Sequence, residues 1–147
     1  LLGRLNSSTK TALIFNTFIS DIELLKAINQ EFGIETSTDG QSKKAYIDTL
    51  NSFLLKTFSG GGNAVLLIDE AQGLSYDVLE QMRMLSNLET EREKLIQIVL
   101  VGQPELNEIL ASPQLKQLNE RITVGLCGTS IAGWREPRNY KFYRRSL

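Results

Sequence analysis

The sequence predicts an α/β fold in three α-β-α layers, with helices on both faces of a mostly parallel sheet. Two observations support this prediction. Short apolar runs alternate along the chain with stretches in which apolar residues recur at helical spacing, an order typical of parallel strands joined by crossover helices. Within the apolar runs, polar residues do not occupy every second position, which is the pattern of strands covered on both sides.

Length and composition limit the chemistry available. The 147 residues, 41% hydrophobic and 22% charged, suit one domain with a substantial core. No apolar run approaches the roughly 18 residues of a membrane span. The first residues do not resemble a secretory signal, and Cys127 is the single cysteine. We therefore expect the protein to reside in the reducing cytoplasm.

The composition excludes two kinds of site. With no histidine and one cysteine, the sequence holds neither a histidine-based triad nor a zinc site built from several Cys and His side chains. The side chains left for catalysis or ligand binding are carboxylates, amides and arginines.

Four apolar runs are expected to form strands, at residues 12–15, 64–68, 95–101 and 122–124. Ser20 opens the first helix, because its hydroxyl can cap the helix while Glu23 reaches back in a capping box, and Gly33 ends it. Further helices are expected to begin at Ser42, after Ser75, at Pro104 and at Pro113.

One motif carries chemistry. Asp69 and Glu70 follow an apolar run, which places two carboxylates at the carboxyl end of a central strand, where ligands of open α/β sheets bind. An aspartate there can hold Mg²⁺ through its water shell, and the next carboxylate can face a γ-phosphate and polarise the attacking water. This is the Walker B arrangement. The alternative is that the two residues only end a strand and begin a turn.

Four sequence blocks extend the motif. They are NAVLLIDEAQ at 63–72, LSNLET at 85–90, VLVGQPEL at 99–106 and LNERI at 118–122. In this order and at this spacing they resemble the AAA+ ATPases of the general secretion pathway protein A family. Residues 1–62 fit this family more loosely. The resemblance implies a P-loop NTPase core that uses ATP and Mg²⁺. Related ATPases that assist transposition share the Asp-Glu-Ala strand and a similar plan.

The resemblance implies three further roles. Gln103 is similar to the sensor-one residue, an amide that hydrogen-bonds the γ-phosphate or the attacking water; alternatively its amide caps the helix begun by Pro104. Arg121 is similar to the residue that ring-forming members offer to the neighbouring subunit's nucleotide; alternatively it is a surface arginine beside Glu120. Asn87 matches a position near the catalytic glutamate, or is an exposed helix residue.

The phosphate-binding loop is missing from the sequence. A P-loop requires Gly-x-x-x-x-Gly-Lys-[Ser/Thr], because its glycines let backbone N–H groups wrap the phosphates. No Gly-Lys pair occurs among the 147 residues. By resemblance, residues 1–5 correspond to the end of the helix that follows this loop. We therefore expect a core truncated at its N-terminus, which binds ATP weakly or not at all by itself.

The C-terminal end also departs from the family. We expect residues 1–124 to form a partial AAA+ core without the helical lid, and residues 125–147 to form a divergent basic and aromatic tail. Aromatic side chains among several cations can stack on bases and pair with phosphates. An irregular terminus, or a sequence changed by truncation or altered coding, is the favoured interpretation, so no nucleic-acid partner is expected.

The leading hypothesis is a partial core of a secretion ATPase. Asp69 holds Mg²⁺ through water, Glu70, Gln103 and Arg121 act in ATP hydrolysis, and Asp69, Glu70 and Gln103 contact the cofactor. In the intact protein, ATP turnover would drive secretion or assembly of secretion machinery. Its partners would be further copies, in a ring or dimer, and secretion-machinery proteins at the cytoplasmic face of the inner membrane, with membrane contact only through regions outside this chain. Two alternatives stay open: a transposition-helper ATPase that binds DNA, and a nucleotide-independent interaction module. Whether this chain is itself an enzyme also stays open.

Overall fold

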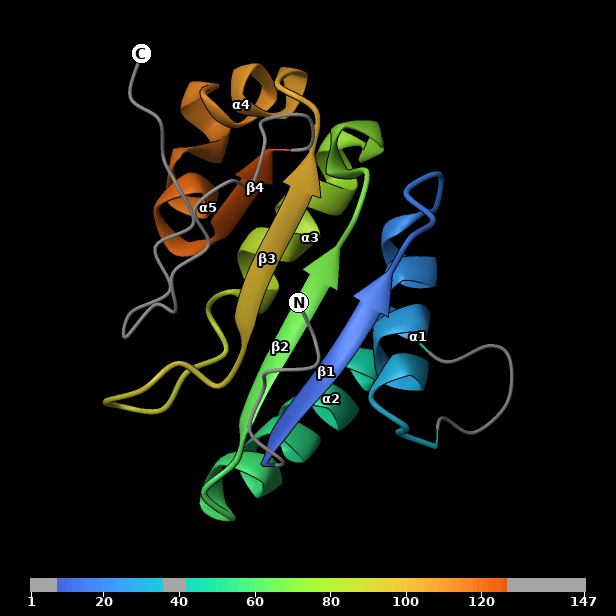
Figure 1. The fold of residues 1–147 in the computed structure, drawn as a ribbon. Helices are drawn as coiled ribbons and strands as arrows, with labels where there is room; N and C mark the ends of the chain where they lie inside the picture. Colours follow the sequence, from blue (N-terminus) through green and yellow to red (C-terminus); the bar gives the residue numbers. More distant parts are fainter. Residues whose placement is uncertain (1–7, 36–41, 127–147) are drawn as a thin grey trace.

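A four-stranded parallel sheet forms the centre of the described residues, which are 8–35 and 42–126 of the computed structural model (Figure 1). The strands are β1 (Thr9–Ile14), β2 (Asn63–Ile68), β3 (Gln97–Gly102) and β4 (Thr123–Leu126). They lie in the order β1-β2-β3-β4, and each neighbouring pair is parallel. The predicted parallel sheet is therefore confirmed, and all its carboxyl ends meet at one edge.

Helices connect consecutive strands. They are α1 (Asp21–Glu31), α2 (Lys43–Ser59), the 3₁₀ turn η2 (Ala71–Gly73), α3 (Tyr76–Leu85), α4 (Glu105–Leu110), the 3₁₀ turn η3 (Pro113–Leu115) and α5 (Lys116–Arg121). The predicted capping box is present, since the Ser20 hydroxyl accepts from the Glu23 N–H and the Glu23 carboxylate accepts from the Ser20 N–H. Within the described ranges, no helix has the length and apolar character needed to cross a bilayer.

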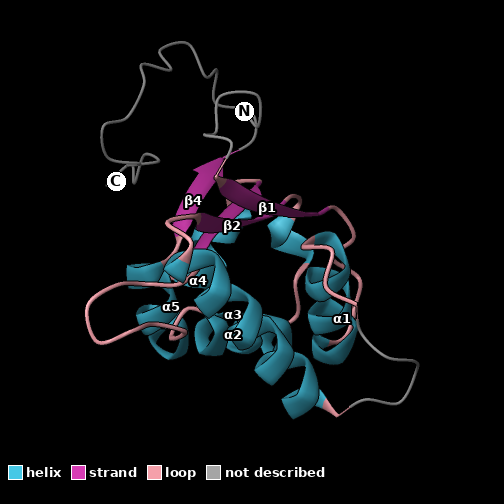
Figure 2. Ribbon diagram, turned by 90° about the horizontal axis from the view of Figure 1, so that it is seen from below, coloured by secondary structure: helices cyan, strands magenta, loops and turns pink. Residues whose placement is uncertain are grey.

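The described helices all lie on one face of the sheet (Figure 2). The strands lie in the sheet in the same order as in the sequence. Right-handed connections between strands in this order all pass over the same face, so the helices lie on one side of the sheet. Burial along the strands agrees: Leu66 and Ile68 are fully buried, whereas Val65 and Leu67, which point the other way, are half-buried. The described residues thus supply one of the two predicted helical layers.

Two predicted boundaries need correction. The first strand was expected at 12–15, but β1 begins at Thr9 because its first residues pair with the start of β2, and Phe15 lies beyond it with 66% of its surface exposed. The third strand was expected to begin at residue 95, but β3 begins at Gln97, where its pairing with Val65 of β2 starts. The predicted tail at 125–147 lies outside the described residues, apart from the two residues that end β4.

Gln81 is a polar residue in the hydrophobic core. Its side chain, on α3, is 1% exposed, and neither its amide oxygen nor its amide nitrogen has a hydrogen-bond partner in the described part of the chain. An amide buried without partners costs about 1–3 kcal/mol, judged from protein variants. Gln81 therefore lowers the stability of the fold.

Replacing Gln81 with methionine should stabilise the protein, because methionine has a similar volume and buries no polar atom. We expect the free energy of unfolding to rise by about 1 kcal/mol, measured by urea denaturation of the 147-residue chain. The matched control is Gln30→Met at an exposed site of α1, with an expected change within about 0.5 kcal/mol. A loss of stability in Gln81→Met alone would mean that the amide has a partner after all.

Candidate functional site

The carboxyl ends of β2 and β3 bring three of the predicted site residues to one edge of the sheet. Asp69 and Glu70 follow β2 directly, and Gln103 follows β3. Both strands are parallel neighbours, with Ile68 opposite Leu100. The sequence motif and the sheet topology therefore place two carboxylates and one amide side by side, at the edge where open α/β sheets bind ligands.

Asp69 is held at the strand end by its backbone. Its N–H donates to the carbonyl of Ile14 at 2.9 Å, which ties it to the end of β1. Its Oδ1 accepts from the N–H of Glu70 at 2.9 Å, and Oδ2 has no hydrogen-bond partner among the described residues. The half-buried side chain thus presents a carboxylate oxygen at the edge of the sheet.

Glu70 has a left-handed backbone, with φ 52° and ψ 37°. Within the described ranges it is the single residue other than glycine with a positive φ. This conformation costs roughly 1–3 kcal/mol and persists when the surrounding structure fixes it, a situation common at functional sites. The exposed side chain is also held, because its Oε2 accepts from Nε2 of Gln72 at 2.6 Å.

Gln103 lies at the turn between β3 and α4. Its carbonyl accepts from the Leu106 N–H at 2.9 Å, and the N-cap residue of α4 is Pro104 rather than Gln103. The interpretation of Gln103 as a capping amide is therefore wrong. Its side chain is exposed, and its backbone N–H is linked through Gln72 to the carboxylate of Glu70.

Gln72 was not singled out from the sequence, although it ends the first of the four blocks. Its side chain contacts both strand ends: it donates to Glu70 and accepts from the backbone N–H of Gln103 at 3.0 Å. The only sequence signal for this role was an amide two residues after the acidic pair. The contact to Gln103 spans 31 residues, so it required the fold.

Arg121 lies at the opposite end of the sheet. It ends α5 immediately before β4 begins, whereas Asp69 and Glu70 follow the end of β2. Strands of four to six residues, rising about 3.3 Å per residue, separate the two edges by roughly 13–20 Å. Arg121 and the two carboxylates of one chain therefore cannot contact the same phosphate.

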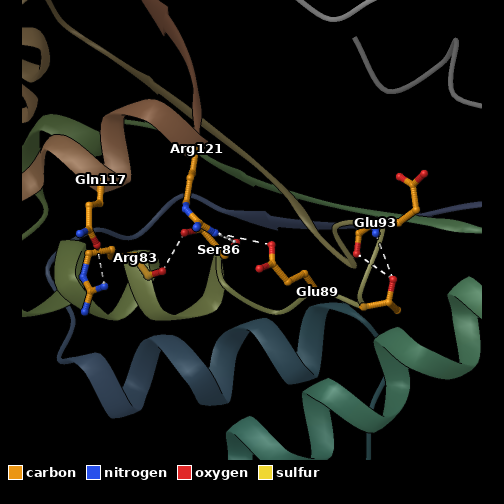
Figure 3. Close-up of polar contacts among 7 residues, drawn as sticks. Arg83, Ser86, Glu89, Glu93, Gln117 and Arg121 are labelled. Atoms are coloured by element: carbon orange, nitrogen blue, oxygen red, sulfur yellow. Dashed lines mark hydrogen bonds and ion pairs between the residues drawn. The ribbon is translucent and has the colours of Figure 1, made fainter.

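The guanidinium of Arg121 contacts the loop after α3 (Figure 3). Its Nη1 lies 3.5 Å from the carbonyl oxygen of Ser86 and 3.7 Å from Oε2 of Glu89. Glu89 begins a short turn that is closed by hydrogen bonds between Thr90 and Glu93. The partner of Arg121 is thus Glu89 and not the neighbouring Glu120, and this half-exposed pair contributes about 1 kcal/mol or less to stability.

A second arginine stabilises the same surface. Arg83 on α3 donates to Oε1 of Gln117 on α5 at 3.2 Å (Figure 3). It also donates to Oε1 of Glu80, within α3, at 2.8 Å. The hydrogen bond from Arg83 lowers the pKa of the Glu80 carboxyl, so that pair is charged near neutral pH. These contacts join α3 to the helix that ends at Arg121.

Asn87 does not lie beside Glu70, contrary to the position suggested by the family. It is exposed in the turn after α3. The ten residues of α3 run between the two edges of the sheet, and at 1.5 Å per residue they place Asn87 about 15 Å from η2. Asn87 is exposed, as the alternative interpretation expected, but it lies in the turn after α3 and not on the helix itself.

The donor set fits a Mg²⁺ ion that is held mainly through water and phosphate. Magnesium prefers carboxylate oxygen and usually keeps several waters, with one or two protein carboxylates and substrate phosphates around it. Asp69 supplies a carboxylate whose Oδ2 has no hydrogen-bond partner in residues 8–35 and 42–126. No group of three or more His, Cys, Asp and Glu side chains that could hold a metal occurs in the described ranges. Asp69 is thus the residue that could contribute a carboxylate to a Mg²⁺ ion held largely through water.

Comparisons of the sequence with a family model and with a known protein agree on the kind of domain. A model described as an AAA domain matches residues 1–110. General secretion pathway protein A of Aeromonas hydrophila is 44% identical over 123 residues, which cover 84% of this chain and 22% of that protein. The chain thus spans about a fifth of this relative's length.

A solved structure shows the same fold. The crystal structure of Cdc6p from Pyrobaculum aerophilum matches with a TM-score of 0.58 at 18% identity, covering 81% of this chain and 31% of that one. At this identity the likeness concerns the fold alone. It confirms the predicted α/β core, and the family model together with the sequence relative confirms the predicted family resemblance. The chain belongs to the AAA+ family of ATPase domains, with general secretion pathway protein A as a relative.

Proposed function

We propose that this chain supplies the hydrolytic half of a Mg·ATP site, and that the intact protein couples ATP hydrolysis to protein secretion or to assembly of secretion machinery. The observation that carries the proposal is the group of Asp69, Glu70 and Gln103 at the carboxyl ends of two paired strands. The 44% identity to general secretion pathway protein A supports the secretion role.

In this proposal each residue has one task. Asp69 binds the water shell of Mg²⁺ through its carboxylate. Glu70 accepts the proton of the attacking water, and the side-chain amide of Gln103 orients that water or donates to the γ-phosphate. Bound Mg²⁺ would neutralise charge on the β- and γ-phosphate oxygens.

Arg121 acts on a different copy of the chain. In one copy it lies at the sheet edge opposite Asp69 and Glu70, so a role in phosphate chemistry requires a second copy that places its nucleotide against this edge. The planar guanidinium would stabilise charge on the transferring phosphoryl group. This assignment requires the chain to self-associate in a ring or dimer. The partner proteins of the secretion machinery would lie at the cytoplasmic face of the inner membrane.

Nucleotide binding, measured by calorimetry on two forms of the protein, tests the proposal. We expect the whole-length natural protein to bind Mg·ATP with a Kd on the order of 10 μM. The 147-residue chain should bind at least about 100-fold more weakly, because the sequence holds no Gly-Lys pair to contact the phosphates. Removing Mg²⁺ with a chelator should weaken binding by the whole protein.

Two results would contradict this expectation. Binding at micromolar Kd by the 147-residue chain would show that the described residues hold the phosphates without a P-loop. Failure of the whole-length protein to bind would instead favour the nucleotide-independent interaction module.

A further inference from the structure

The side-chain amide of Gln72 bridges Glu70 and the end of β3. Its Nε2 lies 2.6 Å from Oε2 of Glu70, and its Oε1 lies 3.0 Å from the backbone nitrogen of Gln103. One amide therefore uses its donor and its acceptor to join the residues after two neighbouring strands.

Chemistry fixes the orientation of this amide. A backbone N–H can only donate, so the atom that faces Gln103 must be the oxygen of Gln72. An ionised carboxylate can only accept, so the atom that faces Glu70 must be the nitrogen. Flipping the amide would lose both hydrogen bonds and place an oxygen against a carboxylate.

The surrounding backbone is shaped for the bridge. A Cβ added to Gly102 would come within 2.7 Å of Oε1 of Gln72 and 3.2 Å of its backbone nitrogen. Glycine at the end of β3 thus permits Gln72 to approach the strand. At the other end of the bridge, Glu70 holds the left-handed conformation that brings its carboxylate to the amide.

We propose that Gln72 is a positioning residue, which fixes the Glu70 carboxylate relative to the strand end that carries Gln103. This inference rests on the proposed function, because it concerns the residue that would activate water. Since Gln72 is bonded to both residues, a shift of the β3 end moves the Glu70 carboxylate with it. The Glu70 carboxylate and the strand end that carries Gln103 would both face the γ-phosphate. Their positions relative to each other therefore stay the same.

The test is a double-mutant cycle in the whole-length protein, with steady-state ATP hydrolysis as the readout. Gln72→Met removes both hydrogen bonds at nearly constant volume. Gln72→Glu keeps an acceptor for Gln103 but places a second carboxylate against Glu70. We expect each to lower kcat about 10- to 100-fold, with KM changed less than about threefold, because the loss concerns orientation. The control is Gln30→Met at an exposed site of α1, with kcat unchanged.

The decisive comparison uses Glu70→Gln as the background. If Gln72 acts through Glu70, then Gln72→Met should cause no further loss of kcat in that background. A further loss as large as in the wild type would overturn the proposal, since Gln72 would then act independently. Wild-type kcat in both Gln72 variants would overturn it as well.

Hydrogen exchange of the 147-residue chain separates the bridge from the proposed reaction. Gln72→Met should speed exchange of the Gln103 amide about tenfold or more, while Gln72→Glu should preserve its protection. If the wild-type whole protein does not hydrolyse ATP, the proposed function fails, and the exchange result alone judges the bridge. Unchanged protection in Gln72→Met would then overturn it, and lost protection would support it.

Discussion

Replacing Glu70 with glutamine in the whole-length protein should lower kcat for ATP hydrolysis about 10²- to 10⁴-fold, the usual contribution of a general base. Glutamine keeps the shape of the side chain but cannot accept a proton from water. Because the proposed role of Glu70 is to activate water and not to hold the phosphates, the affinity for Mg·ATP should change little. Phosphate release measures turnover, and calorimetry measures affinity.

The matched control is Glu31→Gln, which removes an exposed carboxylate at the end of α1. It should leave both quantities at their wild-type values. A Glu70→Gln protein that turns over at the wild-type rate would mean that another group activates the water, and Asp69 and Glu70 would then only end a strand.

Replacing Arg121 with alanine should lower hydrolysis about 10³-fold or more, as expected for an arginine that stabilises the transferring phosphoryl group. Lysine at the same position should restore little, because it lacks the planar, multi-donor guanidinium. Arg92→Ala, at an exposed position of the loop before β3, provides the control. The measurement is phosphate release at saturating Mg·ATP.

Mixing the two inactive proteins shows whether Arg121 serves a neighbouring copy. An Arg121→Ala copy retains Glu70, and a Glu70→Gln copy retains Arg121, so mixed assemblies contain interfaces with both groups intact. We expect the mixture to recover a substantial part of the wild-type activity. Turnover that stays at the level of the separate variants would contradict action between copies, as would full activity in Arg121→Ala alone.

Local features of the fold were predictable from the sequence. The capping box of Ser20 and Glu23, and the caps at Ser42 and Ser75, depend on residues three apart in the chain, so a short segment contains the full signal. The acidic pair after β2 was predictable for the same reason. The apolar run that precedes it identifies a strand, and the carboxylates follow at its end.

The connections between these elements were not predictable, because they depend on residues that are distant in sequence. The bridge from Glu70 through Gln72 to Gln103 requires the pairing of β2 with β3. Arg121 contacts Ser86 and Glu89, about 35 residues away, only because α5 returns beside the end of α3. The left-handed backbone of Glu70 carried no signal either, since glycine is the usual residue there.

Apolar runs in the strands could not show which helices cover which face. The sequence predicts that Leu67 and Val101 are fully buried, but they are half-buried, whereas their neighbours Leu66 and Leu100 are fully buried. Periodicity reports how apolar a strand is on each side. It does not report the strand order, which places all these crossovers on one face.

The nucleotide retained by the Glu70→Gln protein shows whether Glu70 activates the attacking water. The whole-length variant would be incubated with Mg·ATP, passed rapidly through a gel-filtration column and denatured, and its nucleotide separated by ion-exchange chromatography. We expect ATP, because the substitution would remove the proposed water-activating residue and leave Asp69 and the rest of the proposed site unchanged. Recovery of ADP in the same proportion as from the wild-type protein would contradict it.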